Sequence, residues 1–422
     1  MKKIMTVAAI GAVFVSSEAL ASGFNLREQS VAALGNAFTG ATAGADDISY
    51  SYFNPAGLTR HGGVNVNAGG TLVAPRSRAK RAEAGIPNNP LDPSAGTHPS
   101  TSGYTDNIVR EAVLPAAYAS TQINDRLTAG ISFNVPYGMV TKYDDDWAGR
   151  MHGTLSKVET YTLTPMLAYK LTCDLSIGAG VQMQHINARL RNRVALGGMS
   201  EDRAALEGEA TDFGYTLGAL YELSPSTRFG VGYRSQISHK LKGNIRFDTS
   251  TIRNQDIHAR LTTPANLTVG AYHDIDEKWA VMAEFGRTYW SSFQDLVIYG
   301  EKSGLMNWTE EKWKDTTFYG VGATYTFDDQ WKFRGGIAVD QAAVGRHYRT
   351  PRIPDSDRIW FSSGAEYAYS ENVTFNIGYT YIRAEKGKVD LEHSGYDKSR
   401  GYLRADYEND VHILGIGFNY NF

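Results

Sequence analysis

A strict alternation of side-chain types at the end of the chain constrains its fold more than any other feature. Small or polar residues occupy most positions between the large apolar and aromatic ones, which are Leu414, Ile416, Phe418, Tyr420 and Phe422. A period of two residues is typical of a β-strand whose two faces meet different surroundings. In a soluble sandwich the apolar face would contact another sheet. In an outer-membrane barrel it would contact lipid, and the small polar face would line the lumen.

The same alternation recurs in about fourteen segments, an even number, as bacterial barrels require. They span residues 63–74, 110–121, 125–136, 157–170, 175–190, 208–222, 227–245, 260–273, 278–293, 316–327, 331–342, 357–369, 373–388 and 403–422. Short polar turns, such as Asn124-Asp125, alternate with long polar segments, such as 75–109 and 191–207. Because such barrels have short periplasmic turns and long external loops, both termini are expected on the periplasmic side. The sequence predicts an all-β, transmembrane antiparallel barrel.

Composition agrees with this fold class and excludes several others. The 422 residues include 43 Gly and 25 Tyr, which suits strands and tight turns. The mean hydropathy is −0.35, and no apolar run approaches the roughly 18 residues of a membrane helix. A single Cys excludes an intramolecular disulfide framework and a Cys-based zinc site. Because 42 Lys and Arg nearly balance 45 Asp and Glu, no basic face indicates nucleic acid.

The first residues predict export from the cytoplasm. Lys2 and Lys3 precede an apolar stretch from Ile4 to Val15, and Ala19-Leu20-Ala21 supplies small residues for a signal peptidase. This is the pattern of a secretory signal peptide over residues 1–21, with cleavage between Ala21 and Ser22. The alternative, an N-terminal membrane anchor, is disfavoured because the apolar run is too short to span a bilayer.

Residues 22–61 precede the first predicted strand and are rich in Gly and Ala. A lumen enclosed by about fourteen strands is wide enough to leak, and barrels of this size can be plugged from inside. We therefore expect residues 22–61 to form an internal plug and residues 62–422 to form the barrel.

The plug segment resembles the N-terminal hatch of the FadL family, the long-chain fatty acid channels of Gram-negative outer membranes. An Asn-Pro-Ala tripeptide is the hatch signature of that family, and here it is Asn54-Pro55-Ala56. Further pieces match in order along essentially the whole mature chain. They include Ser22-Gly23-Phe24-Asn25-Leu26, Leu34-Gly35-Asn36-Ala37-Phe38, Trp290-Ser291-Ser292-Phe293, Trp313-Lys314-Asp315 and Ile353-Pro354-Asp355-Ser356-Asp357-Arg358.

The resemblance implies a fourteen-stranded barrel with the hatch inside and passive uptake of hydrophobic molecules. Substrate would be captured outside, pass to an apolar pocket and leave sideways into the membrane. The implied partners are fatty acids or other hydrophobic small molecules, lipopolysaccharide and outer-membrane lipid, and the barrel-assembly machinery that reads the aromatic C-terminus. No cofactor is implied.

Four hatch residues are candidates for the site on the strength of the resemblance. Phe24 matches the leading aromatic of the hatch, which in the family reaches the ligand pocket; the alternative is a plain anchoring aromatic. Asn54, Pro55 and Ala56 are expected to hold the hatch geometry that gating needs, because proline fixes φ and a preceding asparagine suits a tight turn.

A fatty acid pocket needs one or two cations for the carboxylate amid apolar walls. Lys314 matches the basic position of the family in its Trp-Lys-Asp piece. The second family cation aligns with Asn192, so Arg191 or Arg193 is the candidate to replace it. The alternative role for either arginine is contact with lipopolysaccharide phosphates.

Strand parity places seven charged residues in the lumen, where we expect an ion-pair network that fixes the hatch: Arg228, Arg234, Glu284, Lys332, Arg334, Asp340 and Glu366. The Asp144-Asp145-Asp146 run suits a solvated loop better than a metal site, and no catalytic motif is complete. Three alternatives to a fatty acid channel stay open. They are an uptake channel for neutral hydrophobics such as monoaromatic hydrocarbons, an aqueous porin and, last, an outer-membrane hydrolase.

Overall fold

The computed structural model describes residues 23–89, 92, 96–197, 200–249, 252–391 and 399–422. The predicted signal peptide and its cleavage site lie outside the described residues. The helical elements are α1 (Val31–Leu34), η1 (Ile48–Tyr52), η2 (Pro55–Arg60) and η4 (Trp290–Ser292). The strands are β1 (Val64–Pro87), β2 (Thr97–Ser102), β3 (Ala112–Gln122), β4 (Leu127–Asn134), β5 (Gly138–Lys142), β6 (Leu155–Lys170), β7 (Leu175–Gly197), β8 (Ser200–Ser224), β9 (Thr227–Arg234), β10 (Ile237–Phe247), β11 (Gln255–Thr263), β12 (Asn266–Asp274), β13 (Trp279–Thr288), β14 (Asp295–Gly300), β15 (Gly304–Glu310), β16 (Thr316–Thr326), β17 (Trp331–Asp340), β18 (Arg358–Ala368), β19 (Val373–Ala384), β20 (Gly387–Leu391) and β21 (Leu403–Asn421). Within the described ranges, no helix is long and apolar enough to cross a membrane.

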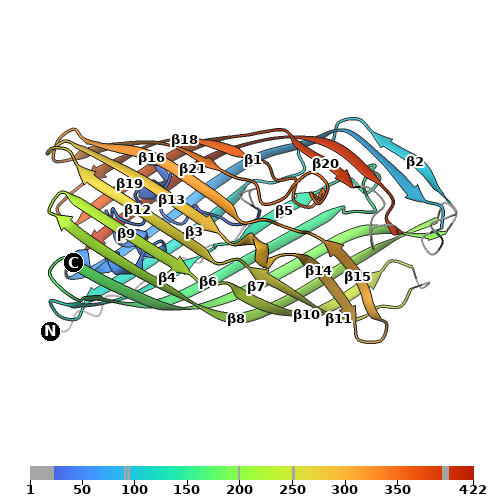
Figure 1. Ribbon diagram of the computed structural model, residues 1–422, viewed down its shortest axis with the longest axis horizontal. Coiled ribbons are helices and arrows are strands. Elements are labelled where there is room, and N and C mark those ends of the chain that lie inside the picture. Colours follow the sequence, from blue (N-terminus) through green and yellow to red (C-terminus); the bar gives the residue numbers. More distant parts are fainter. Residues whose placement is uncertain (1–22, 90–91, 93–95, 198–199, 250–251, 392–398) are drawn as a thin grey trace, which may run out of the picture.

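The strands close into one antiparallel barrel (Figure 1). β1 pairs with β3 on one side and with β21 on the other, so the last strand meets the first. Several wall strands are built from two collinear pieces; β9 and β10, for example, both pair with β8. Grouped in this way, the barrel has fourteen strands, which confirms the predicted fold class.

Some of these strands are interrupted in the half of the barrel that carries the long loops. Pro136 lies between β4 and β5, and Pro264 lies between β11 and β12. Proline has no N–H to donate and a fixed φ, so it interrupts a ladder. β4 pairs with β3 and β6, whereas β5 pairs in the described sheet with β6 alone. Since β3 pairs with β4 only from Ala117 onward, the wall lacks ladder hydrogen bonds between β5 and the start of β3.

Three strands continue well beyond their predicted ends. β1 extends to Pro87, β7 extends to Gly197 and β8 begins at Ser200, so much of the predicted loops 75–109 and 191–207 is strand. In the extension of β1 the outward residues include Arg76 and Arg78 rather than apolar side chains. Apolar alternation reports contact with lipid and stops at the membrane edge, but the hydrogen-bonded ladder continues into water.

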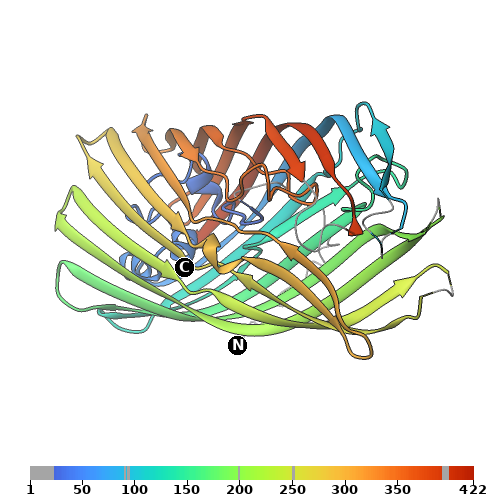
Figure 2. The ribbon, with the colours of Figure 1, turned by 45° about the vertical axis from the view of Figure 1, so that its right-hand side comes forward.

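Residues 23–61, here called the N-terminal segment, lie inside the barrel in the half nearer the C-terminus (Figures 1 and 2). Every residue of α1 and η1 is buried. Lumen charges hold the segment, as predicted from strand parity. Arg228 donates to the carbonyl of Gly44 at 3.1 Å, Arg234 donates to the carbonyl of Tyr52 at 3.3 Å, and Arg334 lies 3.6 Å from the carboxylate of Asp46.

Candidate functional site

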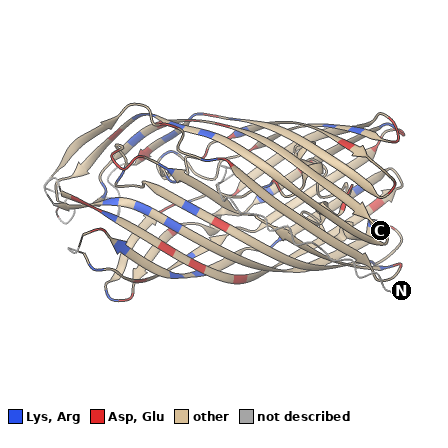
Figure 3. Cartoon of the chain, turned by 180° about the vertical axis from the view of Figure 1, so that it is seen from behind, with Lys and Arg blue, Asp and Glu red and all other residues tan. Residues whose placement is uncertain are grey.

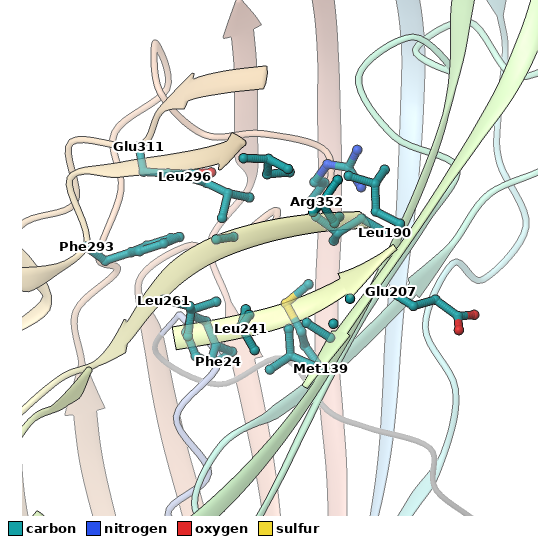
Figure 4. A pocket seen from close by; sticks show the side chains of 18 of the residues that line it. Phe24, Met139, Leu190, Glu207, Leu241, Leu261, Phe293, Leu296, Glu311 and Arg352 are labelled. Atoms are coloured by element: carbon teal, nitrogen blue, oxygen red, sulfur yellow. The ribbon is translucent and has the colours of Figure 1, made fainter. Parts of the chain in front are cut away.

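A mostly apolar cavity lies between the N-terminal segment and the long-loop end of the barrel, and it holds about 750 Å³ of empty space, part of which is open to solvent. Strands β6, β7, β8, β10 and β11 supply much of its wall, mainly with aliphatic side chains, which include Val158, Ala188, Leu190, Leu206, Leu241, Ile257, Ala259 and Leu261. Figure 4 shows Phe24, Met139, Leu241 and Leu261 around the same space, whereas the carboxylate of Glu207 points away from it.

Phe24, predicted from the family resemblance, lines this cavity. Its ring makes edge-on or tilted contacts with four other aromatic rings, at centroid distances of 4.8 to 6.2 Å; they belong to Tyr137, Trp290, Phe293 and Trp313. Such pairs contribute about 0.5–1.5 kcal/mol each beyond the area that they bury. The aromatic cluster therefore fixes the start of the N-terminal segment at the cavity wall.

The backbone on either side of Phe24 is held as well. The N–H of Gly23 donates to Oδ2 of the buried Asp355 at 3.0 Å, and the N–H of Gly138 donates to the carbonyl of Phe24 at 2.9 Å. The N–H of Leu26 donates to the carbonyl of Pro136 at 2.8 Å. The start of the N-terminal segment thus binds Pro136 and Gly138, beside the part of the wall that lacks ladder hydrogen bonds between β3 and β5.

Arg352, on the connection between β17 and β18, brings a positive charge to the cavity. Its Nη1 donates to the carbonyl of Leu155 at 3.0 Å and to Oγ of Ser156 at 2.9 Å, and its Nη2 donates to Oδ1 of Asn192 at 3.4 Å. Burial, and then the nearby Arg400, lower the pKa of Arg352 to about 9, so its guanidinium stays protonated at neutral pH. A charged fork on a mostly apolar wall suits a carboxylate.

Glu311 also lines the cavity and carries the opposite charge. It is buried, and its Oε2 accepts a hydrogen bond from Nε1 of Trp313 at 3.0 Å. Its negative charge acts on Arg352. A ligand carboxylate in this cavity therefore competes with Glu311 for the guanidinium.

The three cations proposed from the sequence lie outside the cavity lining. The side chain of Lys314 is exposed, and its backbone N–H donates to the carbonyl of Ala343 at 2.8 Å. Arg191 is exposed, and Arg193 lies 3.8 Å from the carboxylate of Asp145. Sequence reasoning missed Arg352. There was one indirect indication of it in the sequence, since the uncharged Asn192 stands where the family resemblance implies a cation. In the structure, Arg352 reaches this asparagine from a loop that is distant in the sequence.

Asn54, Pro55 and Ala56 lie at the start of η2 and are not part of the cavity lining. The side-chain Oδ1 of Asn54 accepts from the N–H of Ala56 at 3.0 Å, and Pro55 occupies the first helical position. The amide of Asn54 donates to the carbonyl of Thr42 at 2.8 Å and to the carbonyl of Ala219 on β8 at 2.9 Å. The tripeptide thus starts one helix of the N-terminal segment and ties it to the wall.

No group of three or more His, Cys, Asp or Glu side chains in the described parts of the chain is arranged to hold a metal ion.

Comparison with known proteins gives a consistent result. The sequence matches the model of a family described as outer membrane protein transport protein (OMPP1/FadL/TodX) over residues 12–422. A long-chain fatty acid transport protein of Escherichia coli (strain K12) is 28% identical over 458 residues, which cover 98% of this chain and 97% of that protein. A Pseudomonas aeruginosa FadL homologue of known structure superposes with a TM-score of 0.84 at 24% identity, over 95% of this chain and 100% of that one. The Ralstonia pickettii toluene transporter TbuX gives a TM-score of 0.66 at 18% identity, over 95% and 99% of the two chains.

Proposed function

The chain belongs to the outer membrane transport protein family that includes OMPP1, FadL and TodX, and from this premise we propose that it is a passive channel for long-chain fatty acids. Members of the family are transport proteins of Gram-negative outer membranes, and this barrel is one of them. In this proposal the substrate is a long-chain fatty acid that is captured outside and released sideways into the membrane, and the chain has no catalytic activity. In the same proposal residues 22–61 are the hatch.

The observation that carries the substrate class is the placement of Arg352 in an apolar cavity. Aliphatic and aromatic walls remove a hydrocarbon chain from water, at about 0.8 kcal/mol for each buried CH₂ group. The guanidinium of Arg352 would pair with the carboxylate at one end of such a chain. Lys314, exposed near the long-loop end, is assigned to capture outside rather than to binding within the cavity.

The break in the wall supports lateral release. Phe24 lines the cavity, and its carbonyl together with the N–H of Leu26 holds the chain at the break between β3 and β5. A ligand that displaces Phe24 would disturb the hydrogen bonds that tie the segment to Pro136 and Gly138. Release there would bring an acyl chain to lipid instead of water, which preserves the free energy of its burial.

A second candidate function is uptake of neutral hydrophobics such as monoaromatic hydrocarbons. Glu311 favours it, because this carboxylate already neutralises part of the charge of Arg352 and would repel a ligand carboxylate. The likeness to TbuX is a likeness of fold and is compatible with both candidates.

Uptake of labelled oleate tests the proposal. A Gram-negative host without its own fatty acid channel would be compared with and without this protein, after heat-modified gel mobility has shown that the barrel is folded in the outer membrane. We expect restored oleate uptake. Folded protein that restores toluene uptake but not oleate uptake would replace the fatty acid channel with the second candidate.

A further inference from the structure

Three exposed cations on the outer wall of the barrel form no ion pair with the residues that the structure describes. Lys240 and Lys242 lie on β10 and Arg260 lies on β11, and all three side chains are exposed. Among the described residues no carboxylate oxygen lies within the 4.0 Å of an ion pair from any of them, although Lys242 is opposite the exposed Glu209 of β8. Lys240 is directly opposite Arg260 in the antiparallel register, so two like charges share a cross-strand position. Such an arrangement is destabilising unless an anion lies between the charges.

Several other outward cations of the barrel lie opposite or close to carboxylates. On β1, Arg78 is opposite Glu408 of β21 and Lys80 is opposite Asp406, and Lys80 forms an ion pair with Glu408. On β7, Arg189 lies 3.7 Å from Glu207 of β8. Against this background, the opposed Lys240 and Arg260 are an exception that an external anion would explain.

The position of these cations along the wall identifies the source of that anion. Towards the short-turn end, the outward residues of β8, β9 and β12 form an apolar belt that includes Leu217, Val231 and Val269. Above this belt come the aromatic side chains of Phe213, Tyr215 and Tyr233, and then the hydroxyls of Thr211, Ser238 and Thr262. Lys240, Lys242 and Arg260 follow next towards the long-loop end.

This order of apolar, aromatic, hydroxyl and cationic side chains is that of the boundary between a bilayer and water. Figure 3 shows the charged bands of the wall gathered towards its two ends, with a mainly uncharged zone between them. The cations therefore stand at the level of the headgroups of the outer leaflet.

We propose that Lys240 and Arg260 bind a phosphate of a phosphorylated glycolipid headgroup in the outer leaflet. The guanidinium offers a planar pair of donors and the ammonium offers a mobile point charge, and both suit a phosphate. The acyl chains of the same lipid would lie on the apolar belt beneath. This second contact, which a free phosphate ion cannot make, is why we assign the site to a lipid. The site is independent of the molecule that the channel transports.

Binding of lipid A to the purified protein in mild detergent tests the site. Native mass spectrometry would compare wild type with the Lys240→Gln/Arg260→Gln variant, using bisphosphorylated lipid A and its enzymatically dephosphorylated form. The matched control is Arg78→Gln/Lys80→Gln, which removes two outward cations that face carboxylates. We expect the first variant to bind bisphosphorylated lipid A about tenfold more weakly or worse, the control to bind like wild type, and the dephosphorylated form to bind weakly to all three.

Further measurements keep the test decisive. The Lys240→Arg/Arg260→Lys variant keeps both charges and should bind like wild type; if it loses as much affinity as the Gln variant, the effect is structural and the site is refuted. Inorganic phosphate at the same phosphorus concentration should not displace lipid A; if it does, the site takes the free ion and the lipid assignment is wrong. Equal binding of lipid A by wild type and by the folded Gln variant would also overturn the proposal.

Discussion

At the scale of single residues, the two cations Arg352 and Lys314 differ in where they lie and in what they can do. Arg352 lines the cavity and is anchored by Leu155, Ser156 and Asn192, whereas Lys314 is exposed outside it. A charged hydrogen bond to a carboxylate contributes about 1.5–3 kcal/mol. Of these two cations, Arg352 is the one placed to make that contribution to a ligand in the cavity.

We therefore predict that Arg352→Gln weakens oleate binding about tenfold or more and leaves toluene binding nearly unchanged, because toluene has no charge to lose. Titration calorimetry on the purified protein measures both affinities. Lys314→Met is the matched variant and should leave both affinities close to those of wild type while slowing oleate uptake at low concentration. Equal losses of oleate and toluene binding in Arg352→Gln would refute a carboxylate role for Arg352.

Phe24 is the second residue whose removal has a defined consequence. Truncation of a buried phenylalanine costs about 3–5 kcal/mol, and Phe24→Ala also removes four aromatic contacts. We expect the start of the N-terminal segment to detach from Pro136 and Gly138 and to become sensitive to protease. Limited proteolysis followed by peptide mapping measures this. The matched control is Phe327→Ala at an exposed position, and the same protection in both variants would contradict the anchoring role of Phe24.

At the scale of elements, the N-terminal segment packs against wall strands that have glycine at the points of closest contact. A Cβ added at Gly336 on β17 would overlap the carbonyl of Asn36, and one added at Gly232 on β9 would overlap the carbonyl of Phe53. Both glycines face the lumen. Because side chains alternate between the two faces of a strand, glycines on the lumen face leave room for the backbone of the N-terminal segment, while the side chains on the other face contact lipid.

Gly335 and Gly336 provide a test on adjacent residues of one strand. Gly336→Val places a branched side chain where Asn36 lies, whereas Gly335→Val places it on the outward face, where a Cβ approaches nothing closer than 3.9 Å. We predict that Gly336→Val displaces the N-terminal segment and raises single-channel conductance in planar bilayers, and that Gly335→Val conducts like wild type. Identical conductance in the two variants would show that the segment does not block the lumen at β17.

At the scale of the whole molecule, barrel closure and plugging are separable. The pairing of β1 with β21 closes the wall from residues that lie outside the N-terminal segment. Deletion of residues 22–61 should therefore leave a folded barrel with a several-fold larger conductance, since the lumen loses the segment that fills it. Heat-modified gel mobility tests whether the deletion variant folds, and single-channel recording measures its conductance. A folded deletion variant with unchanged conductance would favour the aqueous porin.

The candidate site was predictable from sequence only where a residue is carried by a local motif. Phe24 and Asn54-Pro55-Ala56 stand in contiguous pieces that resemble the family hatch, and the structure places Phe24 at the cavity and Asn54 between the segment and β8. Arg352 has no such local signal, because its partners Ser156 and Asn192 are 196 and 160 residues away in the chain. Loops have no side-chain period, so their inward residues cannot be read from spacing.

The sequence by itself determined that this protein is a lipid-facing barrel, how many strands it has and which face of each strand is apolar. These properties follow from a two-residue period that each strand carries within a few positions. Only the tertiary structure decided which cation enters the cavity, where the wall lacks its ladder, and that Lys240 faces Arg260. Those properties depend on the register between strands and on the paths of long loops, which bring together residues that no local pattern connects.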